Sequence, residues 1–379
     1  MNYPLDPTIG KLHSSLCDLM KIKYPIIQAG MSGFTTPSLV AEVSNAGGLG
    51  ILGAARLSPS KLKESILEIR KKTDHPFGVN LLLAPPEYDQ NNDVPKVQSY
   101  LNKFRQRLNI PLSDILSTDE IKIPSSTIQE KLQIIFEENV PLLSIGMGNP
   151  AKIVKQAHNS ETKIMAMVTT VNEALSVVEA EVDIIAVQGA EAGGHRSTFE
   201  MDLKSEVPLV GTMALVPQVV DALSHNKFKN IPIVASGGIT DGRGLIAAFS
   251  LGADGILVGT RFLMAEESSI FQGYKERIIT SDATDTIVTK VFSGRHARCI
   301  KNEFVNDHKL SGQNPLSWPF QAIAADDIYN AALLQNNPDF FPLTAGQSVG
   351  GINERGQKAS EIVEEIIVQA KEVLDRLTK

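Results

Sequence analysis

The chain has 379 residues, and its 36 Lys and Arg residues against 43 Asp and Glu residues leave a net charge of −7 at neutral pH. A chain of this length can bury a large core without disulfides or metal ions, and 42% apolar with 21% charged residues exclude a disordered polypeptide. The acidic balance argues against proteins that bind nucleic acid or anionic membranes.

The first twenty residues contain no basic region followed by an apolar run, so the sequence predicts no signal peptide. No apolar run reaches the ~18 residues that a membrane-spanning helix needs. The two cysteines, Cys17 and Cys299, are far apart and form neither a disulfide framework nor a CxxC metal or redox motif. We therefore expect a cytoplasmic protein in a reducing compartment.

Eight short apolar runs alternate along the chain with segments of helical periodicity. Because these runs are continuously apolar, they predict parallel strands that are covered on both faces. Eight strand–helix repeats over about 240 residues predict an α/β fold of the (β/α)₈ TIM-barrel type. The runs span residues 24–31, 48–55, 77–84, 140–148, 163–170, 183–190, 231–238 and 254–262, and amphipathic segments lie at 37–47, 58–72, 170–181 and 242–252.

Two stretches do not follow the alternation of predicted strands and helices. Residues 85–130 form a polar, proline-punctuated insertion after the third predicted strand, and residues 281–379 follow the eighth. Residues 362–377 of this tail have the apolar spacing of an amphipathic helix. We expect a barrel over 20–280 that includes the insertion. The C-terminal segment 281–379 should pack on it and cover the active site, as part of a smaller lid or substrate subdomain.

Three glycine motifs match the GxGxx(G/A) pattern of dinucleotide-binding loops, but none has the required context. The match at 48–53 lies within a predicted strand, and that at 242–247 lies inside a predicted helix. The match at 146–151 follows a strand, but no acidic residue closes the next strand. The motifs therefore do not support a Rossmann-type NAD site.

A better signal is the glycine pair Gly237-Gly238 after the seventh predicted strand together with Val258-Gly259-Thr260 after the eighth. In barrels these two loops commonly form a phosphate site, because glycine lets the anion approach backbone N–H groups closely. Thr260 would add a hydroxyl donor. The alternative is that these glycines only form tight turns.

His195 follows Gly193-Gly194 just after the sixth predicted strand, at the end of the barrel where active sites lie. An imidazole there can remove a proton from a carbon acid. A structural histidine remains the alternative. A metal site is less well supported, because Glu191 is the only evident second ligand.

Six motifs together resemble the nitronate monooxygenase family, formerly called 2-nitropropane dioxygenases, whose members are FMN-dependent (β/α)₈ proteins. They are PIIQAGM at 25–31, FGVNLLL at 77–83, VQGAEAGGHR at 187–196, VASGGITDGRG at 234–244, LVGTRF at 257–262 and FSGRHAR at 292–298. The resemblance implies oxidation of a nitronate or nitroalkane by O₂ to a carbonyl compound and nitrite, with His195 as the base. One departure is Ser197, where glycine is frequent in the family.

The resemblance and the two phosphate loops together give the predicted FMN-binding residues. Asn80 would meet the pyrimidine edge of the flavin ring, since an amide can pair with it. The predicted set is Ala29, Gly30, Met31, Asn80, Gln188, Gly193, Gly194, Gly237, Gly238, Leu257, Val258, Gly259 and Thr260. Arg295 and Arg298 could bind an anion or be surface charges.

Several alternatives remain at the level of sequence. The AGGH loop also resembles flavin-type enoyl-acyl-carrier-protein reductases and NADH:quinone reductases, so an FMN-dependent NAD(P)H reductase is the main alternative. A barrel enzyme for phosphorylated sugars would need charged strand ends, and those here are neutral. A non-catalytic binding protein is the third reading. The sequence predicts no oligomeric state and does not identify the natural substrate.

Overall fold

The computed structural model describes residues 12–84, 87, 93–115, 117, 119–121, 127–200, 206–225, 228, 230–352 and 356–378. Part of the predicted insertion 85–130 lies outside these residues. Eight parallel strands form a closed barrel in the order β1-β2-β3-β4-β5-β6-β8-β9. The strands are β1 (Ile26–Gln28), β2 (Leu49–Gly53), β3 (Phe77–Leu82), β4 (Leu142–Gly146), β5 (Lys163–Val168), β6 (Ile184–Gln188), β8 (Ile233–Ser236) and β9 (Gly255–Val258). Each lies within one predicted run, so the predicted barrel is confirmed.

A ring of helices covers the outside of this barrel. Its members are α3 (Pro37–Asn45), α4 (Pro59–Lys72), α6 (Ile128–Glu137), α7 (Val154–Asn159), α8 (Val171–Glu179), α9 (Thr212–His225), α10 (Gly242–Ser250) and α16 (Ala359–Leu377). The predicted start of α4 is confirmed, because Ser58 Oγ accepts a hydrogen bond from Lys61 N and Pro59 occupies the first turn.

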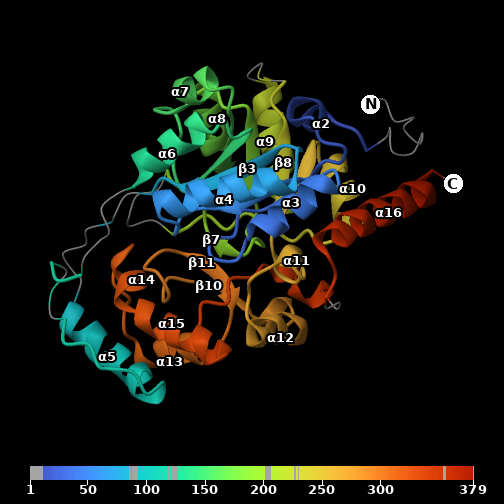
Figure 1. Cartoon of the computed structure of the whole chain (residues 1–379). Coiled ribbons are helices and arrows are strands. Elements are labelled where there is room, and N and C mark those ends of the chain that lie inside the picture. Colours follow the sequence, from blue (N-terminus) through green and yellow to red (C-terminus); the bar gives the residue numbers. More distant parts are fainter. Residues whose placement is uncertain are drawn as a thin grey trace.

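The helix that closes the ring comes from the far end of the sequence. Helix α16 packs against both α10 and α3, which places it between the seventh and first barrel helices (Figure 1). Its buried face joins the core between strands and helices through Ile362, Val363, Ile366, Ile367 and Ala370. The predicted tail helix is confirmed, and it serves as the eighth helix of the barrel.

The N-terminal end of the barrel is plugged by helix α2 (Ser15–Met20). Leu16, Cys17 and Met20 join the side chains that fill the barrel interior. Cys17 and Cys299 are both free, buried thiols. At the opposite end the interior is less closed, because Ala29 and Met167 there are only partly buried.

A second core lies beside the C-terminal end of the barrel. Between β9 and α16 the chain makes a long excursion, residues 260–358, which contains α11 (Thr260–Leu263), α12 (Gln272–Thr280), β10 (Thr286–Thr289), β11 (Ala297–Ile300), α13 (Glu303–Ser311), α14 (Phe320–Ala324), α15 (Asp326–Leu334) and 3₁₀ turns at Ala283–Asp285, Pro338–Phe340 and Gln347–Gly351. Helix α5 (Val94–Arg107) from the predicted insertion packs into the same core. Strands β10 and β11 form a three-stranded antiparallel sheet with β7 (Gly194–His195).

Buried Arg105 joins α5 to this excursion. Its guanidinium pairs with Asp327 and donates to Ala324 O and to Gln98 Oε1. Leu263, Met264, Ile270, Tyr274 and Ile278 also belong to the second core, whereas α16 belongs to the first. The predicted boundaries 20–280 and 281–379 stay a prediction, and the two cores offer a different division.

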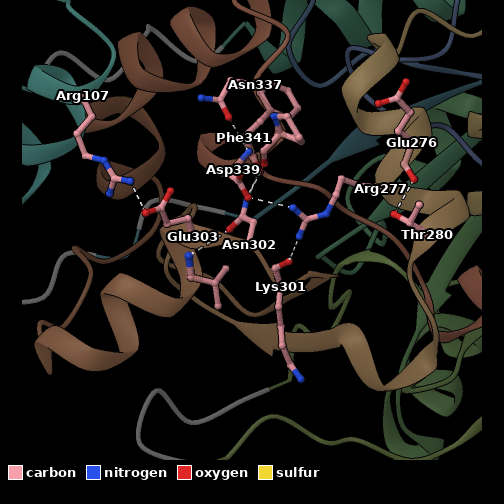
Figure 2. A network of polar contacts seen from close by, with 12 residues as sticks. Arg107, Glu276, Arg277, Thr280, Lys301, Asn302, Glu303, Asn337, Asp339 and Phe341 are labelled. Atoms are coloured by element: carbon pink, nitrogen blue, oxygen red, sulfur yellow. Dashed lines mark hydrogen bonds and ion pairs between the residues drawn. The ribbon is translucent and has the colours of Figure 1, made fainter.

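A polar network ties α12, α13 and the turn after α15 together (Figure 2). Asn302 caps α13 by accepting from Val305 N, and its amide donates to Pro338 O and Phe341 O at 2.9 Å each. Arg277 pairs with Asp339 at 3.0 Å and donates to Lys301 O. These bonds hold α12, the start of α13 and the turn at 337–341 to one another.

The second core contains a histidine that favours folding only when neutral. His308 is 2% exposed, its ring stacks on Tyr100 with centroids 4.8 Å apart, and neither ring nitrogen has a partner among the described residues. Burial lowers its pKa to about 4. Since its folded pKa lies below the unfolded value of about 6.5, its contribution to stability is present above pH 6.5 and is lost as the pH falls toward 4.

A His308→Leu variant should therefore lose less thermal stability between pH 7 and pH 5 than the unmodified protein. Melting temperatures at the two pH values measure this difference directly. A matched His225→Leu variant, at an exposed site on α9, should retain the full acid sensitivity. Equal acid sensitivity in all three proteins would contradict the role assigned to His308.

Candidate active site

The candidate site lies at the C-terminal end of the barrel, where the chain leaves β6. Gln188, the last residue of β6, holds the following segment with both ends of its amide. Its Nε2 donates to His195 O at 3.0 Å, and its Oε1 accepts from Ser197 N at 2.9 Å. Gln188 therefore fixes the backbone on both sides of Arg196. The flavin contact predicted for Gln188 stays a prediction.

His195 lies between the barrel and the excursion. Its Nε2 is 2.8 Å from Ser293 Oγ, and its ring meets the edge of Trp318 with centroids 5.2 Å apart. In β7 it pairs with Ala297 of β11. Removal from water, together with the charges of Arg295 and Arg56, lowers the His195 pKa from 6.5 to about 4. The imidazole is therefore neutral at pH 7 and can accept a proton.

Two buried arginines shape the loop that leads to His195. Arg196 donates to Gln188 O and Gly189 O, and Arg298 donates to Ala190 O at 2.8 Å. The guanidinium groups thus bind three consecutive carbonyls. Arg298 also donates to Thr286 Oγ1, so the structure places it as a scaffold for this loop rather than as a surface charge.

Arg295 has a different environment from Arg298. It pairs with Glu87 at 3.0 Å and donates to Thr198 O. Glu87 also binds the segment around Trp318, because its N donates to Trp318 O and its O accepts from Ser317 Oγ. The insertion and the excursion therefore meet beside His195.

The two predicted phosphate loops have the backbone that a close approach requires. Gly237 and Gly238 have φ angles of +106° and +74°, a conformation that favours glycine. A Cβ on Gly237 would lie 2.8 Å from Ala192 N, so this loop packs tightly on the β6 loop. At Gly259 a Cβ would meet no atom closer than Ala29 Cβ at 3.7 Å, which leaves space in front of this residue.

A segment of the excursion completes this region. Thr260 Oγ1 accepts from Gly346 N at 3.0 Å and donates to none of the residues that the structure describes, so its proton is available to a ligand. Gln347 N donates to Glu191 O at 2.9 Å. A Cβ on Gly193 would lie 2.5 Å from Gly346 N, so Gly193 permits this close contact. Residues 345–347 thus lie beside the phosphate loop at Thr260 and beside the loop after β6.

The ends of β1 and β3 meet at the same end of the barrel. A Cβ on Gly30 would lie 2.5 Å from Asn80 Cβ, so this glycine makes room for the Asn80 side chain. Asn80 Nδ2 donates to Ser144 O at 3.1 Å and to Ser144 Oγ at 3.2 Å. This orientation leaves Asn80 Oδ1 as an acceptor.

The remaining predicted residues fall into two groups. Leu257 buries its side chain in the barrel interior, and Val258 buries its side chain between the strands and the outer helices. Only the backbone of these two residues is therefore left to contact a ligand. Ala29 and Met31 border the space in front of Gly259. Gly194 has a φ of +78° and no heavy atom within 4 Å of a built Cβ.

Sequence reasoning missed five residues that the structure brings to this region: Arg56, Glu87, Glu173, Ser293 and Trp318. Ser293 lies within the motif FSGRHAR, so a role could have been read from that match. The other four carry no local signal, because their positions depend on how distant segments pack. Among the described residues, no group of three or more His, Cys, Asp or Glu side chains could hold a metal ion, and no helix is long and apolar enough to cross a membrane.

Comparisons with known proteins identify the family and agree with the barrel fold. The family model described as "Nitronate monooxygenase" matches residues 13–369. A protein of Staphylococcus saprophyticus described as "Probable nitronate monooxygenase" is 36% identical over 367 residues, which cover 97% of this chain and 100% of that protein.

Two solved structures are similar over nearly their whole length. A nitroalkane oxidase from Streptomyces ansochromogenes is 29% identical with a TM-score of 0.84, covering 96% of this chain and 100% of that one. FabK from Thermotoga maritima is 30% identical with a TM-score of 0.76, covering 97% and 98%.

Proposed function

Because the chain belongs to the nitronate monooxygenase family of flavin oxidoreductases, we propose that it binds FMN and oxidises alkyl nitronates and nitroalkanes with O₂ to a carbonyl compound and nitrite. The observation that carries this proposal is a neutral histidine next to a glycine-lined end of the barrel. His195 supplies a base, and the loops at Gly237-Gly238 and Gly259 suit a phosphate.

The residues at this end of the barrel fit FMN. The space before Gly259, the free proton of Thr260 and the glycine backbone at 237–238 suit its phosphate. The free Asn80 Oδ1 can accept from an N–H of the flavin ring. When bound, FMN supplies the redox step by taking electrons from the nitronate and passing them to oxygen.

His195 would act on the neutral nitroalkane. Its uncharged imidazole removes the acidic proton from the carbon that bears the nitro group. A preformed nitronate has already lost this proton and needs no base. With a pKa of about 4, His195 carries no positive charge at pH 7 that could hold the nitronate anion. The uncharged state is the one that a base requires, and the lowered pKa also makes the imidazole a weaker proton acceptor until substrate binds.

We further propose that parts of 85–130 and 281–379 cover the site. Support comes from Ser293 and Trp318, which contact His195, and from Glu87, which joins the insertion to Arg295. Such a cover would exclude water from the reacting carbon. Helix α16 packs on the outside of the barrel, between α10 and α3, and takes no part in this cover.

Oxygen uptake with propionate 3-nitronate and with a neutral nitroalkane tests the proposed function. We expect uptake with both substrates and release of nitrite. An anaerobic mixture with NADH tests the alternative FMN-dependent NAD(P)H reductase. Rapid bleaching of the flavin by NADH, with no oxygen uptake on nitronates, would replace our proposal with that one.

Arg56 offers a test of substrate charge. Its side chain is exposed, and its charge is close enough to His195 to lower the pKa of that residue. An Arg56→Met variant should raise KM about 2- to 5-fold for a nitronate that carries a carboxylate, the range for a charge pair at an exposed site, and change KM little for one that does not. Arg376→Met on α16 removes a charge outside this region and should leave both KM values unchanged. An equal effect of Arg56→Met on both substrates would contradict this role.

A further inference from the structure

Glu173, in the first turn of α8, is a completely buried carboxylate next to the site. It is 0% exposed, and among the described residues it forms no ion pair within 4 Å. One oxygen accepts from Thr169 N at 2.7 Å and from Thr169 Oγ1 at 2.8 Å. The other accepts from Phe199 N at 2.6 Å and from Glu200 N at 3.1 Å.

These four bonds join two different parts of the barrel end. Thr169 directly follows β5, whereas Phe199 and Glu200 belong to the segment after His195. The two sides also meet directly, because Thr169 Oγ1 lies 2.7 Å from Thr198 Oγ1. Glu173 therefore anchors the chain that leaves His195 to the neighbouring strand.

A continuous set of contacts leads from this anchor to the imidazole. Thr198 O accepts from Arg295, and the backbone N of Arg295 lies 3.3 Å from Ser293 Oγ. Ser293 Oγ in turn lies 2.8 Å from His195 Nε2. On the other side Gln188 holds His195 O and Ser197 N. The segment 195–200 is thus fixed at both ends.

Burying a carboxylate is costly unless hydrogen bonds replace its water shell. Here two of the four donors come from Thr169, which lies between β5 and α8, and the other two come from Phe199 and Glu200, in the segment after His195. The first turn of α8 has its own cap, since Glu173 N donates to Thr170 Oγ1 at 3.1 Å. Thr170 thus supplies the side-chain cap of α8, while the Glu173 carboxylate also binds Phe199 and Glu200 outside the helix.

We propose that Glu173 is a positioning residue for His195. It fixes segment 198–200 and, through Arg295 and Ser293, the orientation of the imidazole. The expected effect on turnover rests on the proposed function, whereas the expected effect on the imidazole does not.

Glu173→Gln tests this inference. The amide keeps the size of the side chain but replaces one acceptor oxygen with a donor, so one pair of the four bonds is lost. Thr170→Ala is the matched control, because it removes the cap of α8 and leaves segment 198–200 bound. Both variants are compared with the unmodified holoenzyme for thermal stability, for kcat and KM, and for the imidazole NMR signal of His195, which is assigned with His195→Asn.

We expect Glu173→Gln to lower kcat on a neutral nitroalkane about 10-fold or more, with KM within about twofold and turnover of preformed nitronate nearly unchanged. The His195 signal should shift in Glu173→Gln and stay in place in Thr170→Ala. If Glu173→Gln does not fold, Thr198→Val removes the hydroxyl contact with Thr169 and should give a smaller change in the same direction.

An unshifted His195 signal in the variant that folds would overturn the inference. Equal losses on both substrates in proportion to the loss of stability would do so as well. If the unmodified protein oxidises neither substrate, the proposed function fails, but the His195 signal still decides whether Glu173 positions the imidazole.

Discussion

A His195→Asn variant should lose about 10²- to 10⁴-fold in kcat/KM on neutral nitroalkanes, the range that a general base contributes. Asparagine can still form a hydrogen bond with Ser293 Oγ, but its amide cannot take a proton from carbon. Turnover of preformed nitronate should fall much less, since that substrate needs no base. Oxygen uptake with the two substrates at pH 7 measures the contrast, and the flavin content of the variant should be unchanged.

His296→Asn is the matched control for this experiment. His296 is also partly buried, and its pKa is likewise lowered to about 4 by burial and by Lys290 and Arg295. The His296→Asn variant should turn over both substrates at rates close to those of the unmodified protein. The unmodified enzyme should lose kcat/KM on the neutral substrate only as the pH approaches 4, because protonation removes the base. Equal losses on both substrates in His195→Asn would rule out the base role.

A Gly259→Asp variant should fold but bind FMN at least about 100-fold more weakly. A Cβ at this position meets no atom closer than 3.7 Å, and the residue has φ −107°, so the substitution does not strain the fold. The new carboxylate would enter the space that we assign to the phosphate, where like charges repel strongly. Flavin titration of the apoprotein measures the affinity, and thermal melting confirms that the variant folds.

Gly259→Ala separates the effect of charge from that of size. Its methyl group enters the same space without charge, so its loss of FMN affinity should be smaller than that of Gly259→Asp. If Gly259→Asp binds FMN as tightly as the unmodified protein, the phosphate does not lie at this loop.

The barrel could be predicted from the sequence because its signals are local. A strand buried on both faces leaves a continuous apolar run, and each of the eight runs contains one observed strand. The position of α16 in the fold could not be predicted. Its apolar face shows that the helix packs against another part of the protein, but does not show which part. Its contacts with α3 join residues more than three hundred positions apart.

The candidate site divides in the same way. His195 and the glycines at 237–238 could be identified because they follow strands directly, at the barrel end where such loops meet. The side chains that define the environment of His195 come from elsewhere in the chain. Ser293 and Trp318 lie on the excursion, and Arg56 follows β2. These side chains lie near His195 only because distant segments pack together in the fold, and those segments share no sequence pattern.

The position of α16 has a consequence for how the chain is made. Ribosomes add ~5–20 residues per second, so the excursion 260–358 takes about 5 to 20 seconds to synthesise after β9 has emerged. During that interval the apolar surfaces of α3 and α10 that α16 later covers remain open to water. The nascent barrel is therefore most vulnerable to aggregation late in translation, when seven helices are present and the eighth has not yet left the ribosome.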